Sequence, residues 1–337
     1  MGCAKGFLGF LGIRKLLLEW KTSPLEAIAR RCRFSVPPLL ALTVAGDLGN
    51  YHLLLELCSH FKAFYLGASL FVTLFLLLFR QWVWSGLGAI CIGLNLWVIV
   101  PWYLPDPSSI PIEGGISLRV MYANVLTKNE NKQGFISRVR EAEPDILVVL
   151  ETDQDWLKAL EVFRDKYPAT LSKARSDDFG IAVFSAFPFT DAAVTTVGGV
   201  EVPAITATIE IGDREIFLLA LHTFPPKIAR WDSHRMKQIE AIPEMIRDRT
   251  QPCLVIADLN AAMWSPYYKQ LIGNTGLRNT RKGFGLLPTW PAYYSPFLIP
   301  IDHILCTPDI QVLHCEKGKQ FGSDHLPLIA DLVIPGS

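Results

Sequence analysis

The segment Leu254–Asn260, "LVIADLN", decides the fold. Its first four residues form a continuous apolar run, which is typical of a strand that is buried on both faces. Asp258 and Asn260 follow directly, and because they are two residues apart they lie on the same side of an extended chain. A buried strand therefore brings a carboxylate and an amide to one point.

Other apolar runs in the C-terminal part of the chain end in the same way. Strand-like runs lie at 117–125, 145–151, 179–185, 204–211, 215–222, 253–259, 301–306 and 326–334, and helix-like stretches lie at 132–143, 153–163 and 226–249. The polar residues at the ends of these strands are Asn124, Glu151, His222, Asp258, Asn260, Asp302, Asp324 and His325. Strands mixed with helices predict one α/β domain with helices outside the sheets. Ligand sites of α/β proteins gather beyond strand ends, so these side chains are expected to converge on one pocket.

Several of these residues also have a structural interpretation when each is taken singly. Asn124 and Asn260 are typical turn formers. Glu151 is placed where an acid in the first turn of a following helix would favour the helix dipole. His222 is equally compatible with a hydrogen-bonded histidine in the core.

The segment Phe321–Leu328, "FGSDHLPL", places Asp324 beside His325 where an apolar strand begins. Neighbouring side chains in a strand point to opposite faces, but the glycine and serine before this pair favour a loop, in which both can face one pocket. Asp302 and His303 are predicted inside a strand, so at most one of them is expected in the site, and His303 is expected either to be structural or to support the site residues from behind.

Taken together, the residues predict a site for a hard cation. Carboxylates and amides are the ligands that Mg²⁺ or Mn²⁺ prefers, and nothing in the sequence resembles a soft-metal site. Two histidines and a metal near such acids suit phosphoryl transfer to water. In that reaction the cation and the imidazoles neutralise charge on the phosphoryl oxygens while a carboxylate orients the attacking water.

The N-terminal part of the chain contains long runs without charge. Residues 63–79 and 81–105 carry no charged side chain. A bilayer core of about 30 Å needs roughly 20 apolar residues in a helix, so the second run is long enough to span it and the first is adequate. A shorter run at 34–46 predicts either a third span or a membrane-embedded piece. The predicted organisation is a basic cytoplasmic segment 1–33, a membrane region 34–105 with two to three transmembrane helices, a linker 106–116 and a catalytic domain 117–337.

The distribution of charge predicts the orientation in the membrane. Seven basic residues and two acidic ones precede Phe34, which favours a cytoplasmic N-terminus. Arg80, between the two long uncharged runs, is also expected in the cytoplasm, so residues 106–337 are expected outside it. No cleavage site follows a compact apolar core near the N-terminus, so a cleavable signal peptide is not predicted.

The formal net charge of zero conceals a split between the two parts of the chain. Lys and Arg number 9 up to residue 110 and 23 after it, whereas Asp and Glu number 5 and 27. The mildly acidic C-terminal part is a poor electrostatic match for nucleic acid. The sequence does not imply a protein partner. A disulfide among Cys253, Cys306 and Cys315 is allowed by the sequence but not required.

The order of the motifs resembles the signature of the endonuclease/exonuclease/phosphatase family. The motifs are "YANV", "DILVVLE", "FGIAVFS", "LHTFPP", "LVIADLNA", "IDHIL" and "GSDHLPL", and they cover roughly residues 117–334. The resemblance implies a four-layer α/β sandwich, with two sheets face to face and helices outside. With the N-terminal spans, "WSPYY" and "GFGLLPTWP", the chain also resembles a membrane-anchored bacterial subgroup, which implies an integral protein of the inner or plasma membrane.

The same resemblance implies a metal side of the site. Glu151 is the principal ligand of a divalent cation, with Asn124 beside it. Asp324 lies near the metal or stabilises the neighbouring histidine.

It also implies a side for water and phosphate. Asp258 activates the water, and Asn260 helps to hold the water or the phosphate. His222 contacts the phosphate or the leaving oxygen. His325 binds the phosphoryl group, and Asp302 orients its imidazole.

Three functions compete on these grounds. The first is a membrane-anchored, Mg²⁺- or Mn²⁺-dependent phosphohydrolase that acts outside the cytoplasm on a lipid-linked or small phosphorylated substrate. The second is a membrane-bound nuclease with the same site, for which the local basic cluster is Arg278, Arg281 and Lys282; a solvated loop is the expected structure of this cluster. The third is a non-catalytic membrane scaffold, which the intact motifs disfavour. Aromatic residues form either a lip for an apolar substrate tail or a packed irregular loop: Trp290, Tyr293, Tyr294 and Phe297.

Overall fold

The chain divides into two compact units in a computed structural model that describes residues 24–106, 114–294 and 297–335. Unit 1 comprises residues up to Ala45 together with Phe61–Val98, and unit 2 comprises Gly46–His60 together with Ile99–Ser337. The membrane region predicted at 34–105 is therefore shared between the two units. Most of the basic segment predicted at 1–33 lies outside the described residues.

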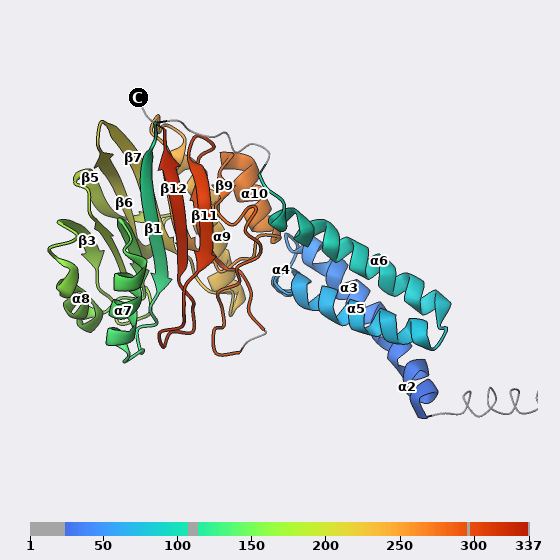
Figure 1. Ribbon diagram of the computed structural model, residues 1–337. Helices are drawn as coiled ribbons and strands as arrows, with labels where there is room; N and C mark the ends of the chain where they lie inside the picture. The colour runs from blue at the N-terminus through green and yellow to red at the C-terminus, as the bar shows by residue number, and fades with distance from the viewer. Residues whose placement is uncertain (1–23, 107–113, 295–296, 336–337) are drawn as a thin grey trace, which may run out of the picture. The chain divides into compact units, whose positions relative to one another are not determined.

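Unit 1 is helical (Figure 1). Its elements are α2 (Pro24–Cys32), η1 (Arg33–Ser35), α3 (Val36–Ala45), α5 (Lys62–Leu78) and α6 (Trp82–Ile99). By length and composition, one helical segment among the described residues, Trp82–Tyr103, is able to cross a membrane. Leu53–Ser59 and Lys62–Leu78 pass the same test only as a pair bent by 66°.

Polar side chains lie inside unit 1 and large apolar ones lie outside. Asn95 is fully buried, and its Nδ2 donates to Thr43 Oγ1 at 3.0 Å, while Ser69 Oγ lies 3.0 Å from Cys91 Sγ. In contrast, Trp97 of α6 is 82% exposed, and Phe71, Leu78 and Val83 are also exposed. This distribution is the reverse of that in a water-soluble helical protein, in which large apolar side chains are mostly inside.

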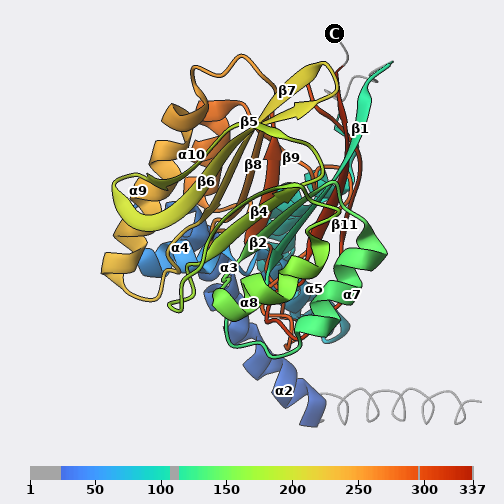
Figure 2. The ribbon, with the colours of Figure 1, turned by 90° about the vertical axis from the view of Figure 1, so that its left-hand side faces the viewer.

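Unit 2 is built on two six-stranded sheets (Figures 1 and 2). The first has the order β11-β12-β1-β2-β4-β3, and the second has the order β5-β6-β7-β8-β10-β9. The strands of the first are β1 (Ile116–Asn124), β2 (Ile146–Leu150), β3 (Ala169–Lys173), β4 (Ile181–Ser185), β11 (Gln311–Lys317) and β12 (Leu328–Ile334). The strands of the second are β5 (Phe189–Val197), β6 (Val200–Ile211), β7 (Arg214–His222), β8 (Cys253–Asp258), β9 (Arg278–Asn279) and β10 (Asp302–Cys306).

The remaining elements of unit 2 are helices. They are η2 (Gly46–Leu48), α4 (Leu53–Ser59), η3 (Val100–Tyr103), α7 (Lys132–Ala142), α8 (Gln154–Leu160), η4 (Glu161–Phe163), α9 (Ala229–Ile246) and α10 (Pro266–Thr275). The helices predicted at 132–143, 153–163 and 226–249 are confirmed by α7, α8 and α9. The helix α10 was not predicted.

The two sheets pack face to face. One apolar cluster contains Val148 and Val183 from the first sheet and Leu218 and Ile256 from the second. On the outer face of the first sheet, side chains of α7 and α8 form a second cluster with those of the strands. Helices α9 and α10 cover the outside of the second sheet (Figure 2). The predicted four-layer α/β sandwich is therefore confirmed.

Strand register brings the ends of the central strands together. In the second sheet β7 and β8 are parallel with His222 opposite Asp258, and the antiparallel β10 places Asp302 opposite Asp258. In the first sheet the parallel strands β1 and β2 end with Asn124 opposite Leu150. Glu151 directly follows β2, so it lies near Asn124 at the C-terminal ends of these two strands. The strand register thus places the predicted site residues of each sheet next to one another at the ends of neighbouring strands.

The three cysteines for which a disulfide was allowed are separate. Cys253, Cys306 and Cys315 are each free and buried. They behave as small apolar residues of the core.

Candidate active site

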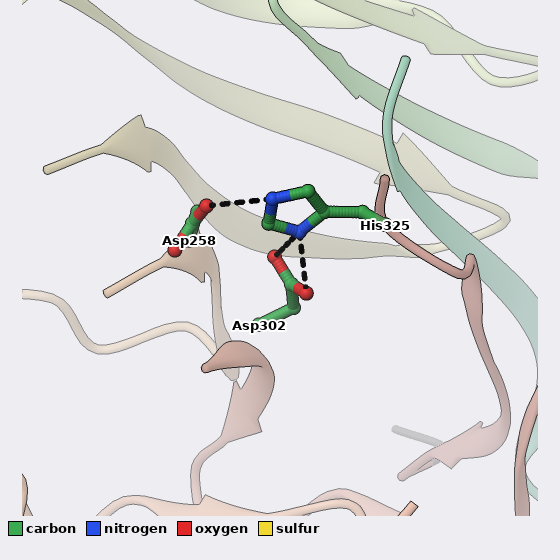
Figure 3. A group of neighbouring side chains, drawn as sticks. All are labelled: Asp258, Asp302 and His325. Atoms are coloured by element: carbon green, nitrogen blue, oxygen red, sulfur yellow. Dashed lines mark hydrogen bonds and ion pairs between the residues drawn. The ribbon is translucent and has the colours of Figure 1, made fainter. Parts of the chain in front are cut away.

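His325 and Asp302 form a buried pair that joins the loop before β12 to the second sheet (Figure 3). The Nδ1 atom of His325 lies 2.9 Å from Asp302 Oδ2 and 3.2 Å from Oδ1. Burial alone would lower the pKa of His325, but the carboxylates of Asp302 and Asp258 raise it well above its usual value. Burial would likewise raise the pKa of Asp302, and the His325 imidazole lowers it instead. At neutral pH the pair is an imidazolium and a carboxylate.

Tyr122 holds this pair from the opposite sheet. Its hydroxyl donates to Asp302 Oδ1 at 2.6 Å, across the interface between the sheets. Sequence reasoning missed Tyr122 because it lies in an apolar run. Its place two residues before Asn124, and hence on the same face of β1, was the available signal.

Asp258 lies between two imidazoles. Its Oδ2 is 3.6 Å from His222 Nε2 and 3.9 Å from His325 Nε2. Burial lowers the pKa of His222 to about 4, so that imidazole is neutral at physiological pH. Burial, together with the nearby charge of Asp302, raises the pKa of Asp258 well above its usual value. Asp258 is therefore a stronger base than an exposed aspartate.

Asn260 lies directly beside this group. Its backbone N donates to Asp258 Oδ1 at 2.8 Å, and its side-chain Nδ2 donates to Thr223 O at 2.9 Å. Asn260 is thus both a turn residue and a neighbour of the carboxylate, so the two interpretations of this residue are compatible.

Glu151 and Asn124 lie side by side at the C-terminal ends of β1 and β2. Asn124 Nδ2 donates to Glu151 Oε1 at 2.7 Å. The other oxygen, Oε2, is buried without a hydrogen-bond partner. Burial raises the pKa of Glu151 to about 7, although the hydrogen bond from Asn124 opposes the shift. The first-turn interpretation of Glu151 is wrong, because the residue that caps α8 is Asp153, whose side chain accepts from Trp156 N.

Asp324 has a similar unsatisfied oxygen. Trp290 Nε1 donates to Asp324 Oδ2 at 3.0 Å, whereas Oδ1 is buried without a hydrogen-bond partner. Asp324 is also close enough to Glu151 to raise the pKa of its carboxyl. The loop predicted at "GSDH" is present, and it is held by Ser323, whose Oγ donates to Asn124 O at 2.8 Å.

Two groupings offer ligands for a cation. Ligand atoms of Asp258, Asp302 and His325 lie within 4.8 Å of one another (Figure 3). Asp302 already accepts from Tyr122 and faces the His325 Nδ1, so its lone pairs are largely used. Glu151 Oε2 and Asp324 Oδ1 are instead buried acceptors that lack a donor, and leaving such a group unsatisfied costs about 1–3 kcal/mol. The donor set around Glu151 therefore fits a hard cation better.

His303 points away from the site, as its position in β10 predicts. Its Nδ1 faces Asn279 Nδ2 at 2.9 Å, and its Nε2 lies 2.8 Å from Ala261 O. Burial lowers the pKa of His303 to about 3.

Replacing His303 by glutamine is expected to reduce the acid sensitivity of the fold. In the unfolded chain a histidine has a pKa near 6.5, so between pH 6.5 and 3 the unfolded chain binds more protons than the folded chain. The contribution of His303 to stability is therefore complete above pH 6.5 and is lost as the pH falls below it. Between pH 7 and 4.5 the wild type should lose about 2.5 kcal/mol more than His303→Gln. Denaturant titrations at both pH values measure this difference. The exposed His314→Gln is the control, and equal losses in wild type and His303→Gln would contradict the expectation.

The basic cluster in the loop after α10 is not solvated as predicted. Arg281 is fully buried and donates to the backbone carbonyls of Asp302 and Leu287. Arg278 and Lys282 also donate to backbone carbonyls within unit 2. The cluster secures the loop against β10 and η3.

Comparisons with known proteins bear on the family and the fold of this chain. The sequence pattern of the Endonuclease/Exonuclease/phosphatase family matches residues 121–325. No curated protein sequence matches the chain. A similar solved structure is the endonuclease/exonuclease/phosphatase from Beutenbergia cavernae, with 20% identity, a TM-score of 0.56, and coverage of 65% of this chain and 72% of that one.

Two further structures show the same fold. The protein of this name from Bacteroides vulgatus has 16% identity and a TM-score of 0.55, covering 64% of this chain and 98% of that one. Humanized D. rerio TDP2 has 13% identity and a TM-score of 0.55, with the same two coverages. The family pattern spans more than half of the chain and includes every candidate site residue from Asn124 to His325. The chain therefore belongs to the endonuclease/exonuclease/phosphatase family.

Proposed function

We propose that this protein is a membrane-anchored, divalent-metal-dependent phosphohydrolase that acts on a lipid-linked or small phosphorylated substrate outside the cytoplasm. Family membership implies the coarser part of this statement, metal-dependent hydrolysis of phosphoester bonds. The observation that carries the proposal is that two different groups of side chains lie at the same ends of the central strands, one suited to bind a cation and the other to bind water and phosphate. Glu151 and Asp324 offer unsatisfied carboxylate oxygens, and Asp258 lies between two imidazoles.

The metal is assigned to Glu151, with Asn124 and Asp324 beside it. Mg²⁺ or Mn²⁺ bound there would neutralise charge on the phosphoryl oxygens. Asn124 orients Glu151 through its Nδ2, and Trp290 orients Asp324 through its indole N–H. Each of these contacts occupies one carboxylate oxygen and leaves the other for the cation.

The water and phosphate are assigned to the second sheet. Asp258 takes a proton from the attacking water at Oδ2, the oxygen that lies between the imidazoles of His222 and His325. His325, held as an imidazolium by Asp302, binds a phosphoryl oxygen through Nε2. His222 is neutral and contacts the phosphate or the leaving oxygen, and Asn260 helps to hold the water or the phosphate.

Anchoring in a membrane is supported by the side-chain distribution of unit 1. Buried polar groups and exposed apolar ones suit a bundle whose solvent is lipid, because hydrogen bonds between helices satisfy polar groups there. Thr43, Cys91 and Asn95 form such a cluster. We assign α5 and α6 as the two principal spans.

The extracytoplasmic placement is supported by the connectivity of the two units. Gly46–His60 and Ile99–Ser337 both belong to unit 2. The chain therefore leaves unit 2 after His60, runs through Phe61–Val98 and returns to unit 2 at Ile99. If α5 and α6 each cross the bilayer, Arg80 between them lies on the opposite side, which the positive-inside rule assigns to the cytoplasm. Reporter fusions after Gly115 and after Arg80 test this. Extracytoplasmic and cytoplasmic signals, respectively, are expected, and the reverse pattern would overturn the placement.

A lipid-linked substrate is supported by the loop that follows Trp290. Tyr294 and Phe297 of this loop are 67% and 59% exposed, and the loop begins at Trp290, whose indole donates to Asp324. The basic cluster that a nuclease would use is engaged within the protein. Exposed aromatic side chains beside a phosphate site suit an apolar tail better than a polyanion.

The double variant Tyr294→Ser/Phe297→Ser is expected to raise KM for a polyprenyl pyrophosphate about tenfold and to leave a water-soluble phosphate ester unchanged. Partial burial of the two rings by a lipid tail would contribute about 1.4 kcal/mol, which is a factor of ten. Steady-state kinetics on both substrates measure the effect. Leu313→Ser removes an exposed apolar side chain from the edge strand β11 and is the control. Equal changes in KM for both substrates would argue against a lipid tail at this loop.

The function itself is tested with the purified full-length protein in detergent and Mg²⁺. The substrates are polyprenyl pyrophosphate, sphingomyelin, inositol phosphates and plasmid DNA, each with Glu151→Gln in parallel. Release of phosphate or phosphorylated head group is expected from a lipid substrate, and EDTA should abolish it. Preferential cleavage of DNA would establish the nuclease instead. Equal activity of Glu151→Gln would overturn the site assignment.

A further inference from the structure

Asn260 has an unusual backbone conformation and makes three hydrogen bonds, two through its backbone and one through its side chain. Its φ is +47°, in the left-handed region that residues other than glycine rarely adopt. The bonds to Asp258 and Thr223 come from the ends of β8 and β7. The third comes from α9, where Arg235 Nη1 donates to Asn260 O. The loop that carries Asn260 is thus fixed from three directions.

Arg235 is itself fixed by buried partners. It is fully buried, and its Nη2 lies 2.9 Å from Glu56 Oε2. It also pairs with Asp232, one turn earlier on the same helix, and its guanidinium lies 5.3 Å from the ring centre of Tyr267. A guanidinium is planar and presents its donors in a rigid fork. Partners on Nη2 therefore set the direction of Nη1 toward Asn260.

Glu56 reaches Arg235 from α4, far away in the sequence. It is fully buried, and its second oxygen, Oε1, accepts from Ser265 Oγ at 2.8 Å. The backbone around it is tightly packed, since a Cβ on Gly49 would lie 2.7 Å from Glu56 Cα. A Cβ on Gly46 would lie 2.7 Å from Ser59 Cα. The two glycines allow η2 and α4 to approach closely, which places the carboxylate.

This arrangement does not resemble a span. A carboxylate in the middle of a bilayer helix is costly, whereas Glu56 is enclosed by an arginine and a serine of unit 2. The segment Gly46–His60 is part of the catalytic unit, although 38 residues separate it from the rest of that unit.

We propose that Glu56 is a positioning residue of the active site, which acts through Arg235 to fix Asn260 and the loop after Asp258. The inference rests on the proposed function, in which Asn260 holds the water or the phosphate. Because α4 leads directly into α5, the same contact joins the active-site loop to the part of the chain assigned to the membrane.

Amide hydrogen exchange on the full-length protein tests the positioning without any substrate. The variants are Glu56→Ala and the near-isosteric Glu56→Gln. The matched control is Asp47→Asn, since Asp47 of η2 lies in the same segment and forms an ion pair with Lys269 of α10 at 3.1 Å, but this pair is exposed. Exchange in the peptide 258–264 is expected to be about tenfold faster in Glu56→Ala, about threefold faster in Glu56→Gln and unchanged in Asp47→Asn.

Unchanged exchange in both Glu56 variants would overturn the proposal. If Glu56→Ala does not fold, as judged by thermal unfolding, Glu56→Gln alone decides, and an unchanged rate there overturns the proposal equally. Faster exchange in Asp47→Asn to the same extent would also overturn it, because the loop would then respond to any change in the segment.

A double-mutant cycle separates positioning from general destabilisation. Glu56→Gln is expected to lower kcat about tenfold and to leave KM within twofold. The second background is Asn260→Asp, because aspartate, like asparagine, tolerates the left-handed backbone conformation. In this background Glu56→Gln should have no further effect on kcat. The same tenfold loss in that background would overturn the proposal. If the wild type hydrolyses none of the substrates, the proposed function fails, and the exchange experiment still decides the positioning.

Discussion

Replacing Glu151 by glutamine is expected to lower kcat/KM at least about 100-fold and to abolish stabilisation by Mg²⁺. Glutamine keeps the size of the side chain and can still accept the hydrogen bond from Asn124 on its carbonyl oxygen, but it carries no charge. Loss of residues that only orient a metal ligand typically costs about 10–100-fold in metal affinity or activity. If Glu151 is the principal ligand, as proposed, its loss should exceed that range.

Thermal unfolding with and without Mg²⁺ measures the second part of this prediction. A ligand that binds only the folded state raises Tm. The wild type should therefore show an increase that Glu151→Gln lacks. In the absence of metal the variant should be at least as stable as the wild type, since it removes a buried carboxyl whose raised pKa reflects unfavourable ionisation. Glu161→Gln, an exposed acid of η4, is the control. A wild-type Mg²⁺ response in Glu151→Gln would refute the metal assignment.

Replacing Asp258 by asparagine is expected to lower kcat by about 10²–10⁴-fold with little change in KM. A positioned general base typically contributes a factor of this size. Asparagine retains an oxygen that can accept from the Asn260 backbone N–H, so the loop should stay in place. What is lost is the basic group between His222 and His325.

Stability distinguishes this chemical effect from unfolding. The pKa of Asp258 is raised, so its charged form is disfavoured in the folded protein, and the neutral asparagine should keep or raise Tm. Asp191→Asn, on the exposed edge strand β5, is the control. A kcat within threefold of the wild type would show that Asp258 is not the base.

The inner strands of each sheet could be predicted from the sequence, whereas the strands at the sheet edges could not. The eight predicted strands are confirmed by the eight that lie inside the two sheets, from β1 to β12. The missed strands are β3, β5, β9 and β11, which are the four edge strands. An edge strand is paired on one side only, and its side chains are largely exposed, as in "FTDAAVTTV" of β5. Such a strand needs no continuous apolar run, so the pattern that reveals a buried strand is missing.

The candidate site divides in a similar way. Side chains at the ends of strands could be predicted, because at each of these positions a polar residue precedes or follows an apolar run. Tyr122 could not, since it is an aromatic residue that becomes part of the site only through its hydroxyl. Trp290 was predicted only as part of an aromatic lip or of a packed loop, and its hydrogen bond to Asp324 could not be predicted. Arg281 was predicted in a solvated loop but is buried, because its charge is stabilised by backbone carbonyls that the sequence does not reveal.

The sequence by itself determined the order of the strands along the chain, the class of fold and the identity of the residues that gather at the strand ends. These depend on local alternation of apolar and polar residues and on short motifs, which are read within a few positions. Only the tertiary structure decided that Glu56 belongs to unit 2 and that Arg235 links it to Asn260. It also decided which carboxylate oxygens lack a partner. Both are contacts between residues that are distant in the chain, and their energies depend on burial and direction, which appear only when the sheets have packed.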